Sequence, residues 1–121
     1  MARYIYLNVN PDQQKVSDCV TRAIHFTTGI PYSQVRKDLY YTGKLFKCEK
    51  LCMCCYRHYI ERILGCKPVN CDGMTLEEFA DKNNKGTYLV RMNGHISSVD
   101  NGDCYDIWDC RQELLTDAWK V

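Results

Sequence analysis

The sequence predicts an α+β protein, with N-terminal helices packed on a small C-terminal antiparallel sheet. Apolar residues recur with a helical period of about 3.6 over much of residues 12–85. After Gly86 the pattern changes to the two-residue alternation of strands. Asn101-Gly102 lies between two such stretches and is the strongest short signal for a β-hairpin. Helices followed by strands, instead of alternating with them, favour an α+β fold.

The length fits one domain over residues 1–121, because 121 residues can bury a single core but not two. The helical part is expected over about 12–85 and the antiparallel sheet over about 86–121. No internal repeat or linker divides the chain.

The first expected elements are a short strand and a helix. Aromatic and aliphatic residues alternate over 4–9, which is typical of a strand. Ser17 or Asp18 is a candidate N-cap for a helix that runs to about Thr28, and Gly29 stops it. The buried face of this helix has the spacing i, i+3, i+4, i+7 and consists of Val20, Ala23, Ile24 and Thr27.

Two further helices are expected before residue 66. Ile30-Pro31-Tyr32 opens the first of them, which ends near Gly43. The second and longer one covers 48–64 and is stopped by Gly65. Its expected inward stripe is Cys48, Cys52, Cys55, Tyr59 and Ile63.

A fourth helix is expected over 75–82, because Thr75 followed three residues later by Glu78 forms a capping box. The remaining sequence predicts strands, or in its last stretch around Leu114 to Trp119 either a strand or a docked tail. The expected strands are 87–92, 96–100 and 103–108.

Charge and hydropathy exclude several classes of partner. Sixteen basic and fifteen acidic residues give a net charge of +1, which argues against a nucleic-acid partner held by phosphate contacts. No apolar run approaches the ~20 residues needed to cross a bilayer. The first residues lack the apolar stretch of a signal peptide, so a cytoplasmic protein without a membrane partner is expected. The sequence does not predict the oligomeric state.

The chain contains nine cysteines, an unusually high number for its length. Their odd number and the lack of an export signal favour reduced thiols over a disulfide framework. Each thiol is therefore a core residue, a metal ligand or a nucleophile. The first of them, Cys19, lies at the start of a predicted helix, where exposed N–H groups and the helix dipole favour a thiolate.

The predicted hairpin brings a histidine and an acid onto one face of the sheet. A two-residue turn at Asn101-Gly102 sets Ser97 opposite Asp106 and His95 opposite Trp108. Asp106 is then diagonal to His95 and can hold the imidazole in the tautomer of a general base, while Trp108 covers the pair. A one-residue slip of the register would bring Asp109 to this position instead.

The order of cysteine, histidine and acid resembles that of the papain-like cysteine peptidases. Gln13 lies six residues before Cys19, at the separation of their oxyanion glutamine, and Asp106-Ile107-Trp108 resembles their Asn-x-Trp element. Three short blocks resemble compact papain-fold proteins of phages and bacteria in particular. These blocks are Asp18-Cys19-Val20-Thr21-Arg22-Ala23-Ile24, Gly94-His95 and Tyr105-Asp106-Ile107-Trp108-Asp109-Cys110.

The resemblance implies a papain-like fold and a thiol hydrolase that cleaves a peptide, isopeptide or other amide bond. Cys19 would be the nucleophile, His95 the general base and acid, Asp106 the orienting group, and Gln13 or Gln14 a part of the oxyanion hole. A peptide or protein substrate and no cofactor follow from this assignment. The chain departs from the family in its small size, in Val20 after the nucleophile, and in an aspartate where the family has asparagine.

Two other interpretations of the sequence remain open. One is a catalytically inactive papain-fold module that binds a host or phage protein, supported by the small size and by Tyr40 and Tyr41. The other is a zinc-stabilised binding domain, because a cysteine cluster with a nearby histidine could supply tetrahedral ligands. Its members are Cys48, Cys52, Cys54, Cys55, Cys66, Cys71 and His58. The helical stripe shared by the first of these cysteines favours core packing over metal binding.

Overall fold

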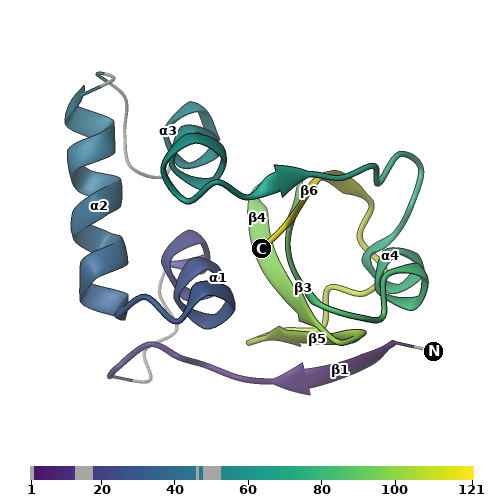
Figure 1. Cartoon of the computed structure of the whole chain (residues 1–121). Coiled ribbons are helices and arrows are strands. Elements are labelled where there is room, and N and C mark those ends of the chain that lie inside the picture. Colours follow the sequence, from purple (N-terminus) through teal and green to yellow (C-terminus); the bar gives the residue numbers. More distant parts are fainter. Residues whose placement is uncertain (1, 13–17, 46, 48–52) are drawn as a thin grey trace.

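The computed structural model describes residues 2–12, 18–45, 47 and 53–121. It has a mixed α and β architecture, as the sequence predicts (Figure 1). In chain order its elements are β1 (Arg3–Tyr6), α1 (Cys19–Thr28), α2 (Tyr32–Leu45), α3 (Met53–His58), the π-helical turn η1 (Tyr59–Ile63), β2 (Lys67–Pro68), α4 (Leu76–Lys82), β3 (Thr87–Met92), β4 (His95–Asp100), β5 (Asp103–Asp106) and β6 (Leu115–Lys120).

The described strands form one sheet in the order β1-β5-β4-β3-β6-β2. The prediction of a purely antiparallel C-terminal sheet is wrong at one edge, because β1 pairs with β5 in parallel. A parallel pair needs a long connection between its strands, and here every helix in the described part of the chain lies between them. The N-terminal strand therefore completes the sheet and holds the end of β5, where Asp106 lies.

Helices cover both faces of the sheet (Figure 1). Helix α1 packs against β4 and β3, with α2 and α3 beside it, whereas α4 packs against β5 on the other side. Each face has its own apolar core. The α1 side contains Ile24, Val35, Leu39, Tyr59, Ile60, Leu89, Ile96 and Trp119; the α4 side contains Leu76, Phe79, Tyr88, Val90, Met92, Val99 and Ala118.

The hairpin at Asn101-Gly102 has the predicted register. Asn101 and Gly102 both have positive φ, of 49° and 85°, as a tight two-residue hairpin turn requires. Asp100 pairs with Asp103, Val99 with Cys104 and Ser98 with Tyr105. The ladder ends there, because β5 stops at Asp106 and the chain bends away. The predicted pairs beyond Ser98 are therefore not part of the ladder.

A second two-residue hairpin, at Asn93-Gly94, connects β3 to β4 and pairs Met92 with His95. The sequence carries the same Asn-Gly signal at this turn. The signal predicts a strand that starts at His95, one residue before the start at Ile96 that the alternation predicts. A Cβ on Gly94 would meet no atom within 4 Å, but the residue has a φ of +72°. Gly94 is thus required for the turn and not for the close approach of a neighbour.

The predicted helix over 48–64 is described from Met53 onward, and it changes from α to π hydrogen bonding after His58. The N–H of Leu64 donates to the carbonyl of Tyr59 at 2.9 Å, five residues back. This wider turn ends the four-residue spacing of the buried stripe. Ile63, predicted to face inward, is consequently 56% exposed, while Tyr59 and Ile60 are fully buried.

The end of the chain is a strand and not a docked tail, since β6 lies between β3 and β2. Strand β2 was missed because two residues, one of them Pro68, are too few for an alternating pattern.

The other predicted helices are present, and the capping box is formed: the N–H of Glu78 donates to Oγ1 of Thr75, and the N–H of Thr75 donates to Oε1 of Glu78.

Candidate active site

Cys19 is the first residue of α1, and its side chain is partly buried. Asp18 occupies the N-cap position but makes no capping hydrogen bond with its side chain. Its carboxylate instead binds Arg22, one turn further along the helix. The first N–H groups of α1 are therefore not capped by Asp18, and their positive dipole acts on the Cys19 thiol.

His95 begins β4, directly after the Asn93-Gly94 turn, and its side chain is only 12% exposed. Its Nε2 lies 2.6 Å from Oδ2 of Asp106, the last residue of β5. The backbone carbonyl of Asp106 accepts hydrogen bonds from the N–H of Leu7 and the hydroxyl of Tyr4, so the segment around β1 fixes its main chain. The sheet thus brings together the histidine and the acid that the hairpin pattern predicts as neighbours.

Cys19 and His95 influence the ionisation of each other. Burial opposes ionisation of the Cys19 thiol, but a hydrogen bond with His95, the Ile96 backbone and nearby positive charge together lower its pKa. Burial also opposes protonation of His95, yet hydrogen bonds with Asp106, Cys110 and Cys19 raise the pKa of His95 to about 11. The two shifts in opposite directions favour a thiolate–imidazolium pair over a neutral thiol and a neutral imidazole.

The buried carboxylate of Asp106 is surrounded by donors. Oδ2 accepts from His95 and, at 3.7 Å, from the Cys110 thiol. Oδ1 accepts from the backbone N–H of Ile107 at 2.7 Å and from Nη1 of Arg22 at 3.3 Å. Burial raises the pKa of a carboxyl group, but His95, Ser97 and Ile107 outweigh it and lower the pKa of Asp106. Asp106 is consequently an anion that can orient His95.

Trp108 and Asp109 follow Asp106 in the chain and differ in what their side chains contact. The Trp108 ring lies 5.1 Å from the His95 ring, centroid to centroid, but is 40% exposed, so it contacts one side of the histidine without enclosing it. Asp109, the alternative orienting acid, is exposed and binds the Arg111 guanidinium through both carboxylate oxygens. Asp106, and not Asp109, is therefore the acid beside His95.

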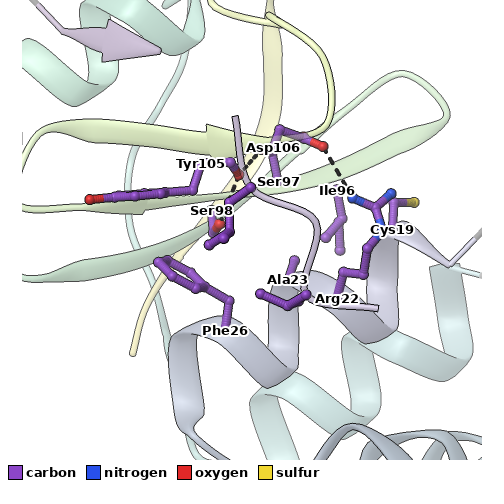
Figure 2. A pocket seen from close by; sticks show the side chains of 11 residues that line it. Cys19, Arg22, Ala23, Phe26, Ile96, Ser97, Ser98, Tyr105 and Asp106 are labelled. Carbon is purple, nitrogen blue, oxygen red and sulfur yellow. Dashed lines mark hydrogen bonds and ion pairs between the residues drawn. The ribbon is translucent and has the colours of Figure 1, made fainter. Parts of the chain in front are cut away.

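Gln13 and Gln14, the two predicted oxyanion residues, lie outside the described residues. A small cavity does lie beside Cys19, between α1 and the β4–β5 end of the sheet (Figure 2). Its volume is about 10 Å³, room for about one water molecule. This space is too small to hold a peptide segment.

Two residues at the site, Arg22 and Cys110, were not singled out from the sequence. Asp18 and Arg22 are spaced i, i+4 on a helix, which is the usual signal for an ion pair, but no local pattern links Arg22 to Asp106, 84 positions away. Cys110 follows the end of β5, where no regular spacing predicts its contact with Asp106.

The cysteines proposed as zinc ligands separate in the structure as far as it describes them. Cys55 is fully buried and donates to the carbonyl of Leu39, Cys66 packs in the core on the α1 side, and Cys71 packs in the core on the α4 side. Cys48 and Cys52 lie outside the described residues, as does the side chain of Cys54.

A different trio, His95, Asp106 and Cys110, has potential ligand atoms within 4.8 Å of one another. The short Nε2–Oδ2 contact is that of a hydrogen bond, and it leaves no room for an ion between these two atoms.

No family model, curated protein or solved structure matches this chain. None of the helices in the described part of the chain has the length and apolar character needed to span a membrane. The site consists of a partly buried cysteine at a helix start, a strand histidine and a buried aspartate within an α+β fold.

Proposed function

We propose that this chain is a papain-like thiol hydrolase, with Cys19 as nucleophile, His95 as general base and acid, and Asp106 as orienting residue. The observation that carries the proposal is the 2.6 Å contact between His95 and Asp106, with His95 also among the causes that lower the pKa of Cys19. Nε2 is bound to Asp106, which leaves Nδ1 as the ring nitrogen available to Cys19. A nucleophile, a base within reach and a third group that orients the base are the parts of a catalytic triad.

The proposed reaction is the hydrolysis of an amide bond. The Cys19 thiolate attacks the carbonyl carbon, and the C–N bond breaks as the His95 imidazolium protonates the leaving amine. Water then attacks the resulting thioester while neutral His95 takes its proton, and the C–S bond breaks, which releases the carboxylic acid and restores the Cys19 thiolate and the His95 imidazolium. Asp106 keeps Nε2 protonated throughout, so that Nδ1 performs both proton transfers.

The substrate is proposed to be a peptide, isopeptide or other amide that reaches Cys19 from outside. The cavity beside Cys19 is lined by the segment after β1 and by α1, β4 and β5, with the charged Arg22 and Asp106 among its residues, and it has room for no more than about one water molecule. An amide that presents a small or exposed carbonyl group is therefore favoured over one whose side chain must enter a deep pocket.

The same small cavity favours one alternative, a catalytically inactive module that keeps the triad residues but binds a protein partner. The two functions differ in what they require of the thiol. A hydrolase needs a Cys19 that is a reactive thiolate at neutral pH, whereas an inactive module does not.

The proposal is tested by treating the native protein with iodoacetamide at pH 7 and following each cysteine by peptide mass spectrometry. Cys19 should be alkylated fastest, and His95→Ala should slow its alkylation by about tenfold or more, because the imidazolium no longer stabilises the thiolate. Cys104 is an internal control: burial raises its pKa to about 12, and it should stay unlabelled.

Hydrolysis is then measured with fluorogenic peptide amides, with Cys19→Ala as the blank. Turnover that is lost in Cys19→Ala and His95→Ala supports the hydrolase. Similar labelling of several cysteines, unaffected by His95→Ala, would contradict it. Fast labelling of Cys19 with no turnover of any amide would favour the inactive module.

A further inference from the structure

A buried arginine connects α1 to the proposed triad. Arg22 lies one turn after Cys19 on α1, and its side chain is only 8% exposed. Nε binds Oδ1 of Asp18 at 2.6 Å, and Nη1 binds Oδ1 of Asp106 at 3.3 Å. Figure 2 shows the guanidinium reaching from the helix to Asp106, on the same side of α1 as the sulfur of Cys19.

Asp18 is itself held in place by other parts of the fold. Its second oxygen, Oδ2, accepts hydrogen bonds from the hydroxyl of Tyr32 on α2 and from Nδ2 of Asn10 in the segment after β1. The carboxylate that anchors Arg22 is therefore tied to two separate segments. As a result, the guanidinium has a fixed position from which it contacts Asp106.

The donors around Asp106 explain why the residue is an aspartate and not the asparagine of papain-like peptidases. Arg22 and the Ile107 N–H both donate to Oδ1, and His95 and Cys110 both lie at Oδ2. The NH2 group of an asparagine can only donate hydrogen bonds. It would therefore face two other donors whether it replaced Oδ1 or Oδ2 of Asp106. A buried arginine would also lose the negative charge that balances it.

We infer that Arg22 is a positioning residue of this site, which holds Asp106 as an ionised carboxylate in the orientation that binds His95. The inference rests on the proposed function for its catalytic meaning, although the Arg22–Asp106 contact is independent of it. The positive charge of Arg22 acts on the nucleophile as well, since it is one of the causes that lower the pKa of Cys19. Burial opposes the charge of Arg22, but the two aspartates raise the pKa of Arg22 further, so it stays charged.

The test is the pH profile of Cys19 alkylation by iodoacetamide in the wild-type protein and in Arg22→Met, Arg22→Lys and Arg111→Met. Arg22→Met should move the midpoint of the profile upward by about one pH unit and slow alkylation at pH 7 by about tenfold, because Asp106 and the thiolate both lose a neighbouring positive charge. Arg22→Lys keeps the charge but cannot bind both aspartates through a planar guanidinium, so it should recover part, but not all, of the shift. Arg111→Met removes a guanidinium from the Asp109 pair and should leave the profile unchanged.

The outcomes separate this inference from the proposed function. A folded Arg22→Met protein with the wild-type profile would overturn the positioning role, even if Cys19 remains selectively reactive. Equal reactivity of the cysteines in the wild-type protein would instead overturn the proposed function. If Arg22→Met does not fold, Arg22→Lys decides: a midpoint shifted upward by a fraction of a unit supports the role, and an unshifted midpoint contradicts it.

A second comparison uses the asparagine of the papain-like pattern. In the Asp106→Asn background, Arg22→Met should slow Cys19 alkylation by less than it does in the wild-type protein, because Arg22 has no carboxylate left to position and only its direct effect on the thiolate is lost. Additive effects of the two substitutions would show that the residues act independently and would contradict the inference.

Discussion

Nε2 of His95 and Oδ2 of Asp106 lie 2.6 Å apart, although their strands are no longer paired at that point. The contact forms because β4 begins at His95 and β5 ends at Asp106, at the same end of the hairpin. An ionised aspartate can only accept, so Nε2 of His95 donates. The orientation of the imidazole is thus determined by two strand ends.

This contact predicts the titration of His95. Hydrogen bonds with Asp106, Cys110 and Cys19 overcome the cost of burial and raise the pKa of His95 to about 11, so the ring should stay protonated through neutral pH. Asp106→Ala removes the first of these partners and should lower the pKa of His95 by at least one unit. Titration of the imidazole resonances by NMR measures both values. A wild-type pKa near 6.5 would contradict the prediction.

The Cys19 thiol should titrate below its ordinary value. The rate of iodoacetamide alkylation of Cys19 should reach half of its maximum at a pH below 9.0, because His95, the Ile96 backbone and Arg22 outweigh the effect of burial on its pKa. His95→Ala should move this midpoint toward higher pH. His25→Ala, which changes a histidine at the other end of α1, is the matched control and should leave the midpoint in place.

The β4–β5 side of this site could be predicted from sequence because its signals are local. Asn101-Gly102 specifies a two-residue turn, and the turn specifies which residues of the flanking strands are neighbours. The same reasoning predicts the contact of His95 with Asp106 and leaves Asp109 as the alternative that a one-residue slip of the register would bring there. Where the ladder ends is set by the bend after Asp106, which no alternation in the sequence reveals.

The rest of the site depends on packing between distant segments. The parallel pairing of β1 with β5 joins residues about 100 positions apart, and the contact of Arg22 with Asp106 joins a helix to a strand end. No periodicity encodes either contact. The second contact arises because burying the apolar face of α1 against β4 brings Cys19 and Arg22 to this end of the sheet.

The buried carboxylates predict a loss of stability in acid. Burial raises the pKa of Asp18, but Tyr32, Arg22 and Asn10 outweigh it, and the pKa values of both Asp18 and Asp106 fall below 3.8. Their contribution to stability is therefore fully present above about pH 3.8 and is lost as the pH falls through the folded-state pKa values. Urea unfolding between pH 7 and pH 2 should show a free energy of unfolding that decreases as the pH falls below about 3.8.

Two variants identify the source of that acid dependence. Asp18→Asn should lower the free energy of unfolding at pH 7, because Arg22 loses its closest anion, and should reduce the decrease between pH 4 and pH 2. Asp109→Asn removes an exposed ion pair with Arg111 and should change stability by less than about 1 kcal/mol. Equal effects of the two substitutions would contradict a special role for the buried network.

Gly94 is the last residue before His95, and its φ of +72° predicts how the turn responds to substitution. Gly94→Ala should lower the free energy of unfolding by about 1–2 kcal/mol, the cost of a left-handed backbone for a residue with a Cβ. The space around this position is open, so no collision adds to the cost. Gly94→Asn is the matched control and should lose less, because asparagine tolerates this conformation better. Urea unfolding of the two variants measures the difference. An equal loss in both would mean that Gly94 is needed for the room it leaves and not for its backbone conformation.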